Sequence, residues 1–125
     1  PTRRIVVADD NLDAAESLAR LLRLHGHEVW TAHHGAEAVQ MVDPYQPEIV
    51  LFDIGMPKPN GYEAAREIRN HPGGRRRILV AVTGWGQEED RRRSFEAGID
   101  HHIVKPVEED TLEVLFSSSH ERPRH

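Results

Sequence analysis

The sequence IVLFDIGMP, residues 49–57, joins a run of four apolar residues to a single carboxylate, Asp53. A continuous apolar run of this kind is typical of a strand that is buried on both faces, as in a parallel sheet. A charge at the end of such a strand costs free energy unless another group pairs with it. We therefore expect Asp53 to have a partner at the end of this strand.

Four other segments resemble this run, and segments with helical spacing of apolar residues separate them. The predicted strands cover residues 4–9, 28–32, 48–53, 78–83 and 101–105. The predicted helices lie between Asn11 and Gly26 and at about 35–43, 60–70, 87–97 and 108–118. This alternation predicts an α/β fold, with one parallel sheet, right-handed crossovers and helices on both faces. Five strands favour the flavodoxin-like (βα)5 doubly wound sheet with strand order 2-1-3-4-5.

The composition limits the class of protein. A chain of 125 residues is one domain, and the lack of cysteine excludes disulfides and thiolate zinc sites. No apolar segment approaches the ~20 residues of a membrane span, and the first residues lack the apolar core of a signal peptide, so we expect a cytoplasmic protein without membrane contact. The net charge of −5 argues against direct nucleic-acid binding, and the arginine triplets at 75–77 and 91–93 fit a solvated surface.

The predicted strand order brings three carboxylates together. The first and third strands are neighbours, so Asp9 and Asp10 lie beside Asp53 at the switch point where such sheets bind ligands. Three crowded carboxylates need raised pKa values or a neutralising cation. Magnesium prefers oxygen ligands and is usually shared between carboxylates and phosphate oxygens. Asp53 can then act as a nucleophile, because a carboxylate can form an aspartyl phosphate.

Two more predicted strand ends point to phosphoryl chemistry. Thr83 ends the fourth strand and Lys105 ends the fifth, both on the side of Asp53. A hydroxyl, an ammonium group and a metal supply the positioning and charge neutralisation on which phosphoryl transfer depends. Each residue alone is a weak signal, but together the strand ends favour a phosphate-binding site.

Several short motifs follow one another in the order and spacing of a known family. They are VVADDN with the acidic pair, LFDIGMP followed by NGYE, VAVTGWG with Thr83, and VKP with Lys105. Over residues 3–118 the sequence resembles the receiver domain of bacterial two-component response regulators. The segment from Thr83 to residue 107 is most similar to receivers at the C-terminal end of hybrid sensor histidine kinases.

The resemblance implies a phosphorelay function. Asp53 would take a phosphoryl group from a phosphohistidine on a histidine kinase or a histidine phosphotransfer domain, and the domain would act as a conformational switch. Magnesium would be held by Asp10, Asp53 and the backbone carbonyl of Gly55, and by Asp9 largely through water.

The same resemblance implies roles for further residues. Thr83 would bond to a phosphoryl oxygen, and Lys105 would pair with the phosphoryl group. The bond between Lys105 and Pro106 would be cis, which X-Pro bonds permit. The family often has Tyr or Phe as a rotamer switch three residues before this lysine, where the chain has His102. Independently of the resemblance, the large apolar indole of Trp85, two residues after Thr83, would cover the phosphoryl group and slow its hydrolysis, unless it only packs on its own loop.

The domain organisation follows from the extent of the resemblance. Residues 1–118 would form the receiver domain, and residues 119–125, which have no periodic pattern, a disordered tail. The isolated domain is expected to catalyse only its own magnesium-dependent phosphorylation and dephosphorylation.

Two alternatives use similar sheets or similar chemistry. Phosphatases of the haloacid-dehalogenase type also combine a phosphorylated Asp, magnesium, a hydroxyl and a lysine, but their general acid stands two residues after the nucleophile. Here that position is Gly55, which cannot transfer a proton. A nucleotide-binding module would need a phosphate-binding loop, but no G-x-x-x-x-G-K-[ST] motif occurs, and GWGQEE has Glu89 where a dinucleotide motif needs its last glycine.

Overall fold

A computed structural model describes residues 2–54, 61–83, 95–105, 107, 108 and 110–112. Its centre is a parallel sheet of five strands in the order β2-β1-β3-β4-β5. The strands are β1 (Arg4–Ala8), β2 (Glu28–Ala32), β3 (Ile49–Asp53), β4 (Ile78–Thr83) and β5 (His101–Val104). The helices are α1 (Leu12–Leu24), α2 (Gly35–Tyr45), α3 (Gly61–Asn70) and the short 3-10 turn η1 (Gly74–Arg76). The flavodoxin-like doubly wound sheet predicted from the sequence is confirmed.

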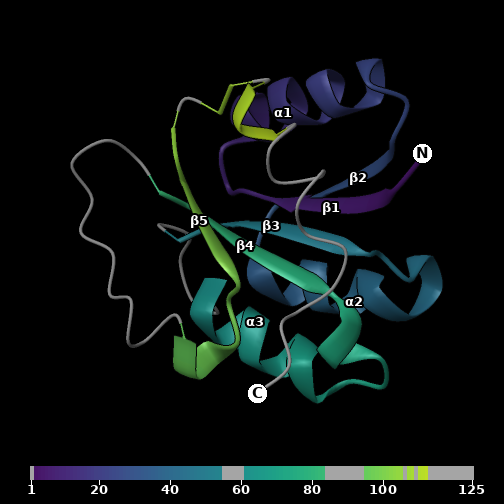
Figure 1. Cartoon of the computed structure of the whole chain (residues 1–125), viewed down its shortest axis with the longest axis vertical. Coiled ribbons are helices and arrows are strands. Elements are labelled where there is room, and N and C mark those ends of the chain that lie inside the picture. Colours follow the sequence, from purple (N-terminus) through teal and green to yellow (C-terminus); the bar gives the residue numbers. More distant parts are fainter. Residues whose placement is uncertain (1, 55–60, 84–94, 106, 109, 113–125) are drawn as a thin grey trace.

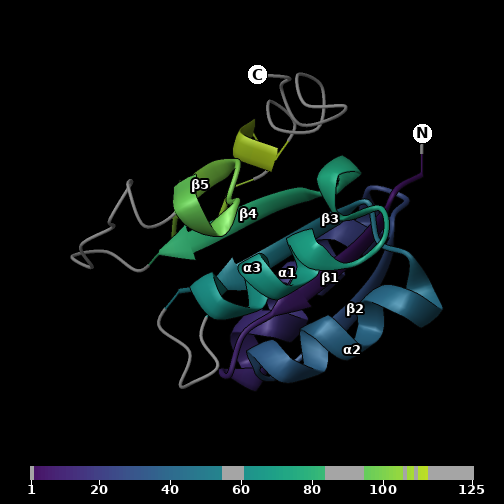
Figure 2. The same cartoon turned by 90° about the horizontal axis from the view of Figure 1, so that it is seen from below.

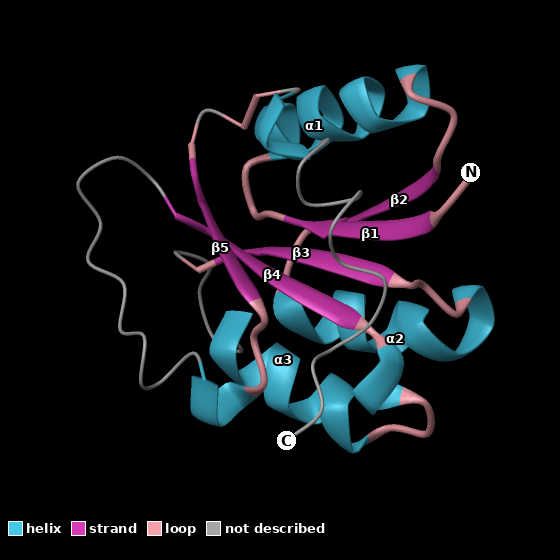
Figure 3. Ribbon diagram, viewed as in Figure 1, coloured by secondary structure: helices cyan, strands magenta, loops and turns pink. Residues whose placement is uncertain are grey.

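Helices cover both faces of the sheet (Figure 1). α1 lies on one face, and α2 and α3 lie on the other. In the view turned by 90°, α2 and α3 lie in front of the strands (Figure 2). The same three layers are plain when the ribbon is coloured by secondary structure (Figure 3). Because all five strands are parallel, their carboxyl ends lie at the same edge of the sheet, and the helices that follow them begin at this edge.

Alternate strand residues feed two hydrophobic clusters, one on each face. β3 and β4 are buried along their whole length, as their continuous apolar sequences predicted. The cluster beneath α2 and α3 includes Val6, Val50, Phe52, Leu79, Ala81, Val42, Ala64, Ala65 and Ile68. The cluster beneath α1 includes Ile5, Val7, Ile49, Leu51, Val80, Val82, Ala15, Ala19, Leu22 and Leu112. Two buried clusters hold the sheet rigid between the helix layers, so that its edge can position side chains.

The ends of α1 follow from two local signals. The side chain of Asn11 accepts a hydrogen bond from the backbone N–H of Ala14 at 3.0 Å, which satisfies one of the unpaired donors of the first turn. Gly26, just after the helix, has a φ of +88°, a conformation that glycine adopts without strain. The predicted helix start and stop are both confirmed.

α2 is longer than its sequence predicted, because it continues through Pro44 to Tyr45 instead of ending at residue 43. Pro44 has no N–H to donate to Gln40 O, and the helix ends one residue after it. Gln46 then closes the helix with a φ of +48° and donates its backbone N–H to Val42 O at 2.9 Å.

Parts of the predicted fourth and fifth helices lie outside the described residues. Residues 95–97 and 110–112 are helical, in agreement with the predictions at 87–97 and 108–118. Asn60, the first residue of the predicted helix at 60–70, and the predicted tail at 119–125 also lie outside the described residues. None of the described helices is long and apolar enough to cross a bilayer.

Candidate functional site

Four strand ends contribute polar side chains to one edge of the sheet. Asp9 follows β1, Asp53 is the last residue of β3, Thr83 is the last residue of β4, and Lys105 follows β5. Because β1 and β3 are neighbours at the switch point of the sheet, their terminal carboxylates share one crevice.

The crevice holds three carboxylates. The carboxylate oxygens that Asp9, Asp10 and Asp53 offer to a metal all lie within 4.8 Å of one another. Asp9 and Asp53 are only 5% and 9% exposed, whereas Asp10 faces solvent. The structure thus brings together the three acids that the strand order predicted, with two of them held in the protein and one open to water.

Lys105 is the cationic partner of the two buried acids. Its Nζ lies 3.1 Å from Asp9 Oδ2 and 3.3 Å from Asp53 Oδ2. The sequence predicted that Asp53 needs a partner. It predicted that a metal would neutralise the carboxylates and that Lys105 would pair with the phosphoryl group. In the structure the lysine itself neutralises part of the charge, so its side chain already reaches the Asp53 carboxylate.

Burial and charge shift two pKa values in the crevice. Burial raises the pKa of Asp9, and the neighbouring Asp53 adds to this, while the Asn11 N–H that donates to Asp9 Oδ1 at 2.9 Å acts in the opposite direction. Burial also acts against the charge of Lys105, but hydrogen bonds and charges from Asp9 and Asp53 outweigh it and raise the pKa of the ammonium group. Lys105 is therefore firmly cationic at neutral pH.

Thr83 and Lys105 are placed by the pairing of β4 with β5. The backbone N–H of Lys105 donates to Thr83 O at 2.7 Å. The hydroxyl of Thr83, which is 2% exposed, donates a long hydrogen bond of 3.5 Å to Ile103 O. The only hydrogen bond that the described residues give this hydroxyl is thus a weak one to the backbone of β5.

The remaining predicted residues are placed only in part. Gly55, Trp85 and Pro106 lie outside the described residues. His102 lies in the middle of β5, half-buried, opposite Ala81 of β4. It occupies the place of the predicted switch residue on the strand that leads to the lysine.

A cavity of about 530 Å³ lies beside the carboxylates. Its walls are mostly apolar side chains from α1 and the central strands, and three of its lining residues are Asp9, Asp53 and Lys105. Two leucines of α1 contribute to one wall: Leu18 and Leu21. No sequence pattern predicted this cavity, because it depends on how the helix lies over the sheet.

Comparisons with known proteins agree with this geometry. The family model described as response regulator receiver domain matches residues 5–116. Protein PilH of Pseudomonas aeruginosa is 33% identical over 109 residues, which are 87% of this chain and 90% of that protein. The receiver domain of sensor histidine kinase PA1611 from Pseudomonas aeruginosa, solved with magnesium in its active-site cleft, has a TM-score of 0.82 at 27% identity and covers 94% of this chain and 96% of its own. Chemotaxis protein CheY4 of Vibrio cholerae, with a TM-score of 0.86 at 21% identity over 94% of this chain and 98% of its own, supports the fold alone.

These similarities do not favour the phosphatase alternative. The matched family spans nearly the whole described sheet, including the acidic pair after β1 and the lysine after β5. The strand order, the carboxylates at its switch point and the family match lead to one conclusion: the chain belongs to the response regulator receiver domain family of two-component signalling.

Proposed function

We propose that this receiver domain accepts a phosphoryl group on Asp53 from a phosphohistidine, and that magnesium assists the transfer. The observation that carries the proposal is the surroundings of Asp53. Its carboxylate ends a central strand, shares a crevice with Asp9 and Asp10, and lies 3.3 Å from the ammonium group of Lys105. The ammonium group of Lys105 is therefore close enough to pair with a phosphoryl group transferred to Asp53.

The donor set fits magnesium. All three side chains offer carboxylate oxygens, which are the ligands that this hard cation prefers. Asp10 is exposed, so the water molecules that a bound magnesium ion retains have room on that side. The carbonyl of Gly55 remains a predicted further ligand. When bound, magnesium would offset negative charge on the phosphoryl oxygens. The magnesium in the similar PA1611 receiver supports this assignment.

The residues of the chain take separate parts in the transfer. An Asp53 oxygen attacks phosphorus, an O–P bond forms, the N–P bond of the phosphohistidine breaks, and the leaving imidazole keeps the electron pair and takes up a proton. Lys105 would exchange its contact with the Asp53 carboxylate for one with a phosphoryl oxygen. Thr83 would turn its hydroxyl from Ile103 O towards another phosphoryl oxygen, which alters a contact between β4 and β5.

The partner and setting are further parts of the proposal. The donor is a histidine kinase or a histidine phosphotransfer domain, and the similarity to the PA1611 receiver is compatible with attachment to a hybrid sensor kinase. Roles for His102, Trp85 and Pro106 in switching, a receiver domain at 1–118 with a disordered tail, and a cytoplasmic location stay predictions.

Beryllofluoride, a phosphoryl mimic, tests the site without turnover. Its affinity should rise with magnesium, and by linkage the affinity for magnesium should rise with beryllofluoride by the same factor. Asp53→Asn should abolish this coupling and Asp10→Asn should weaken it. Asp13→Asn, which removes an exposed acid in the first turn of α1, is the matched control and should leave it unchanged. Titrations in which the two ligands bind independently would contradict the proposal.

A further inference from the structure

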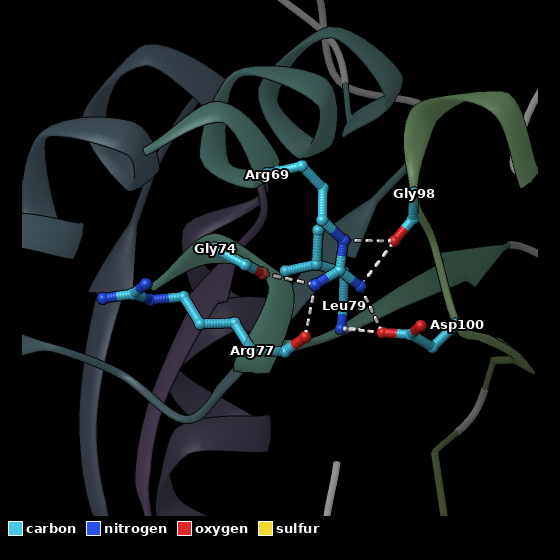
Figure 4. A network of polar contacts seen from close by, with 6 residues as sticks. All are labelled: Arg69, Gly74, Arg77, Leu79, Gly98 and Asp100. Atoms are coloured by element: carbon cyan, nitrogen blue, oxygen red, sulfur yellow. Dashed lines mark hydrogen bonds and ion pairs between the residues drawn. The ribbon is translucent and has the colours of Figure 1, made fainter. Parts of the chain in front are cut away.

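A buried arginine joins three segments of the chain (Figure 4). They meet at the start of β4, at the opposite end of the sheet from the carboxylates. The guanidinium of Arg69, at the end of α3, has five N–H groups, and each of them donates to an acceptor. Nε and Nη2 both donate to Gly98 O, at 2.9 and 2.6 Å, and Nη1 donates to Gly74 O and Arg77 O. The second Nη2 hydrogen goes to Asp100 Oδ2. The two side chains of this ion pair are only 9% and 4% exposed.

Asp100 is also fixed to β4. Its Oδ2 accepts the backbone N–H of Leu79 at 2.9 Å, and its own backbone N–H donates to Leu79 O at 2.8 Å. Both the side chain and the backbone of Asp100 therefore hold the second residue of β4. Because β5 begins at the next residue, these bonds decide where the pairing of the two strands starts.

β5 is a short edge strand, so few contacts set its register. It has four residues and pairs only with β4 in the described sheet, from Val80 opposite His101 to Thr83 opposite Val104. A strand rises ~3.3 Å per residue and alternates its side chains between the two faces. A slip by one residue would move Lys105 by about that distance and send its side chain to the other face.

The contacts of Lys105 leave no room for such a slip. Its Nζ lies 3.1 Å from Asp9 and 3.3 Å from Asp53. Its backbone N–H donates to Thr83 O, which continues the β4–β5 register one residue beyond β5. Asp100 precedes the four residues of β5 and Lys105 follows them. What holds one end of this short edge strand therefore places the lysine at the other end.

We propose that Arg69 and Asp100 are a positioning pair for Lys105: they set the β4–β5 register that brings the lysine ammonium to Asp53. The inference rests on the proposed function, because the position of Lys105 affects phosphoryl transfer only if Asp53 is the acceptor. A buried ion pair adds little net stability, because the cost of desolvation offsets the attraction between the charges. The ion pair can specify the register of β5 even when it adds no net stability.

The first test is the rate at which acetyl phosphate with magnesium labels variants of the full chain. Arg69→Met should slow labelling by about tenfold or more, since misplacing a reacting group by ~1 Å can cost up to ~100-fold. Asp100→Asn, which keeps an acceptor for Leu79 N–H, should slow it less and remains usable if Arg69→Met does not fold. Arg66→Met removes an exposed cation from the same helix and should label at the wild-type rate. Wild-type labelling rates in folded Arg69→Met and Asp100→Asn would overturn the inference.

The second test separates positioning from a general structural role. Lys105→Ala should slow labelling, and adding Arg69→Met to it should slow labelling no further, because the pair acts through the lysine. A full additional loss in the double variant would overturn the positioning role. Wild-type labelling in Lys105→Ala would instead show that the proposed part of Lys105 in the transfer fails, and the inference would fail with it. Slow labelling of Lys105→Ala together with wild-type labelling of Arg69→Met would overturn the positioning role of the pair but not the proposed role of Lys105.

Discussion

The ammonium nitrogen of Lys105 lies 3.3 Å from Asp53 Oδ2 and joins the ends of two strands that are not neighbours in the sheet. The same nitrogen lies 3.1 Å from Asp9 Oδ2. A divalent cation in this crevice would neutralise the same carboxylates. The lysine and the cation are therefore expected to oppose each other when no phosphoryl group is present to bind both.

Replacing Lys105 with methionine should destabilise the domain and tighten its binding of magnesium. The two buried acids would lose their cationic partner, at a cost of about 1–2 kcal/mol, which is less than the ~3–5 kcal/mol for a fully buried pair because a third of the lysine side chain is exposed. Urea unfolding with and without magnesium measures both effects. Arg20→Met, which removes an exposed cation from α1, is the control. Equal stabilisation of Lys105→Met and the wild type by magnesium would contradict the competition.

His27 should make the stability of the domain fall as the pH is lowered. Burial and the nearby charge of Arg3 lower the pKa of His27, and its Nδ1 accepts the backbone N–H of Arg3 at 3.1 Å, which only a ring unprotonated at Nδ1 can do. The unfolded chain takes up the proton near pH ~6.5, before the folded chain does. The contribution is thus complete above that pH and is lost as the pH falls towards the folded pKa.

One titrating group can change the free energy of unfolding by at most about 1.4 kcal/mol per pH unit. Urea unfolding between pH ~7.5 and ~5.5 measures it for the wild type and for His27→Asn, whose amide oxygen can accept the same N–H. The variant should lose less stability over this range than the wild type. An identical pH dependence of the two proteins would show that His27 does not contribute.

Two glycines offer a comparison of backbone strain with a steric clash. Gly26 and Gly98 have φ values of +88° and +91°, so alanine at either position should cost roughly 1–2 kcal/mol from the left-handed conformation. A β-carbon at position 98 would also lie 2.6 Å from Cγ of Arg69, whereas the described residues place nothing within 4 Å of one at position 26. Gly98→Ala should therefore lower the free energy of unfolding by clearly more than Gly26→Ala. Equal losses would mean that Arg69 moves aside without cost.

The sheet was predictable because its signals extend over whole segments. The apolar runs of β3 and β4 are long enough to show burial on both faces, and strict alternation with helices leaves few possible strand orders. The end of α2 was not predictable, because Pro44 lacks a helix N–H and predicts a stop before it, and the local sequence does not show that the helix continues through Pro44 to Tyr45.

The site was predictable where it follows from strand ends. Asp9 and Asp53 lie together because parallel neighbours end at the same edge. The double contact of Lys105 was not predictable, because it depends on the path of a long side chain across the sheet. Arg69 and Asp100 are 31 residues apart and show no local pattern, so their pairing is visible only once α3 is packed beside β4 and β5.

The central claim is that Asp53 receives the phosphoryl group, and locating the label by mass spectrometry tests it most directly. After incubation with acetyl phosphate and magnesium, reduction with borohydride converts a phosphorylated aspartate to homoserine and marks its position. The account predicts one marked residue, Asp53, with no label in Asp53→Asn and full label in the control Asp13→Asn. Undiminished label in Asp53→Asn, or a mark at a different residue of the wild-type chain, would contradict it.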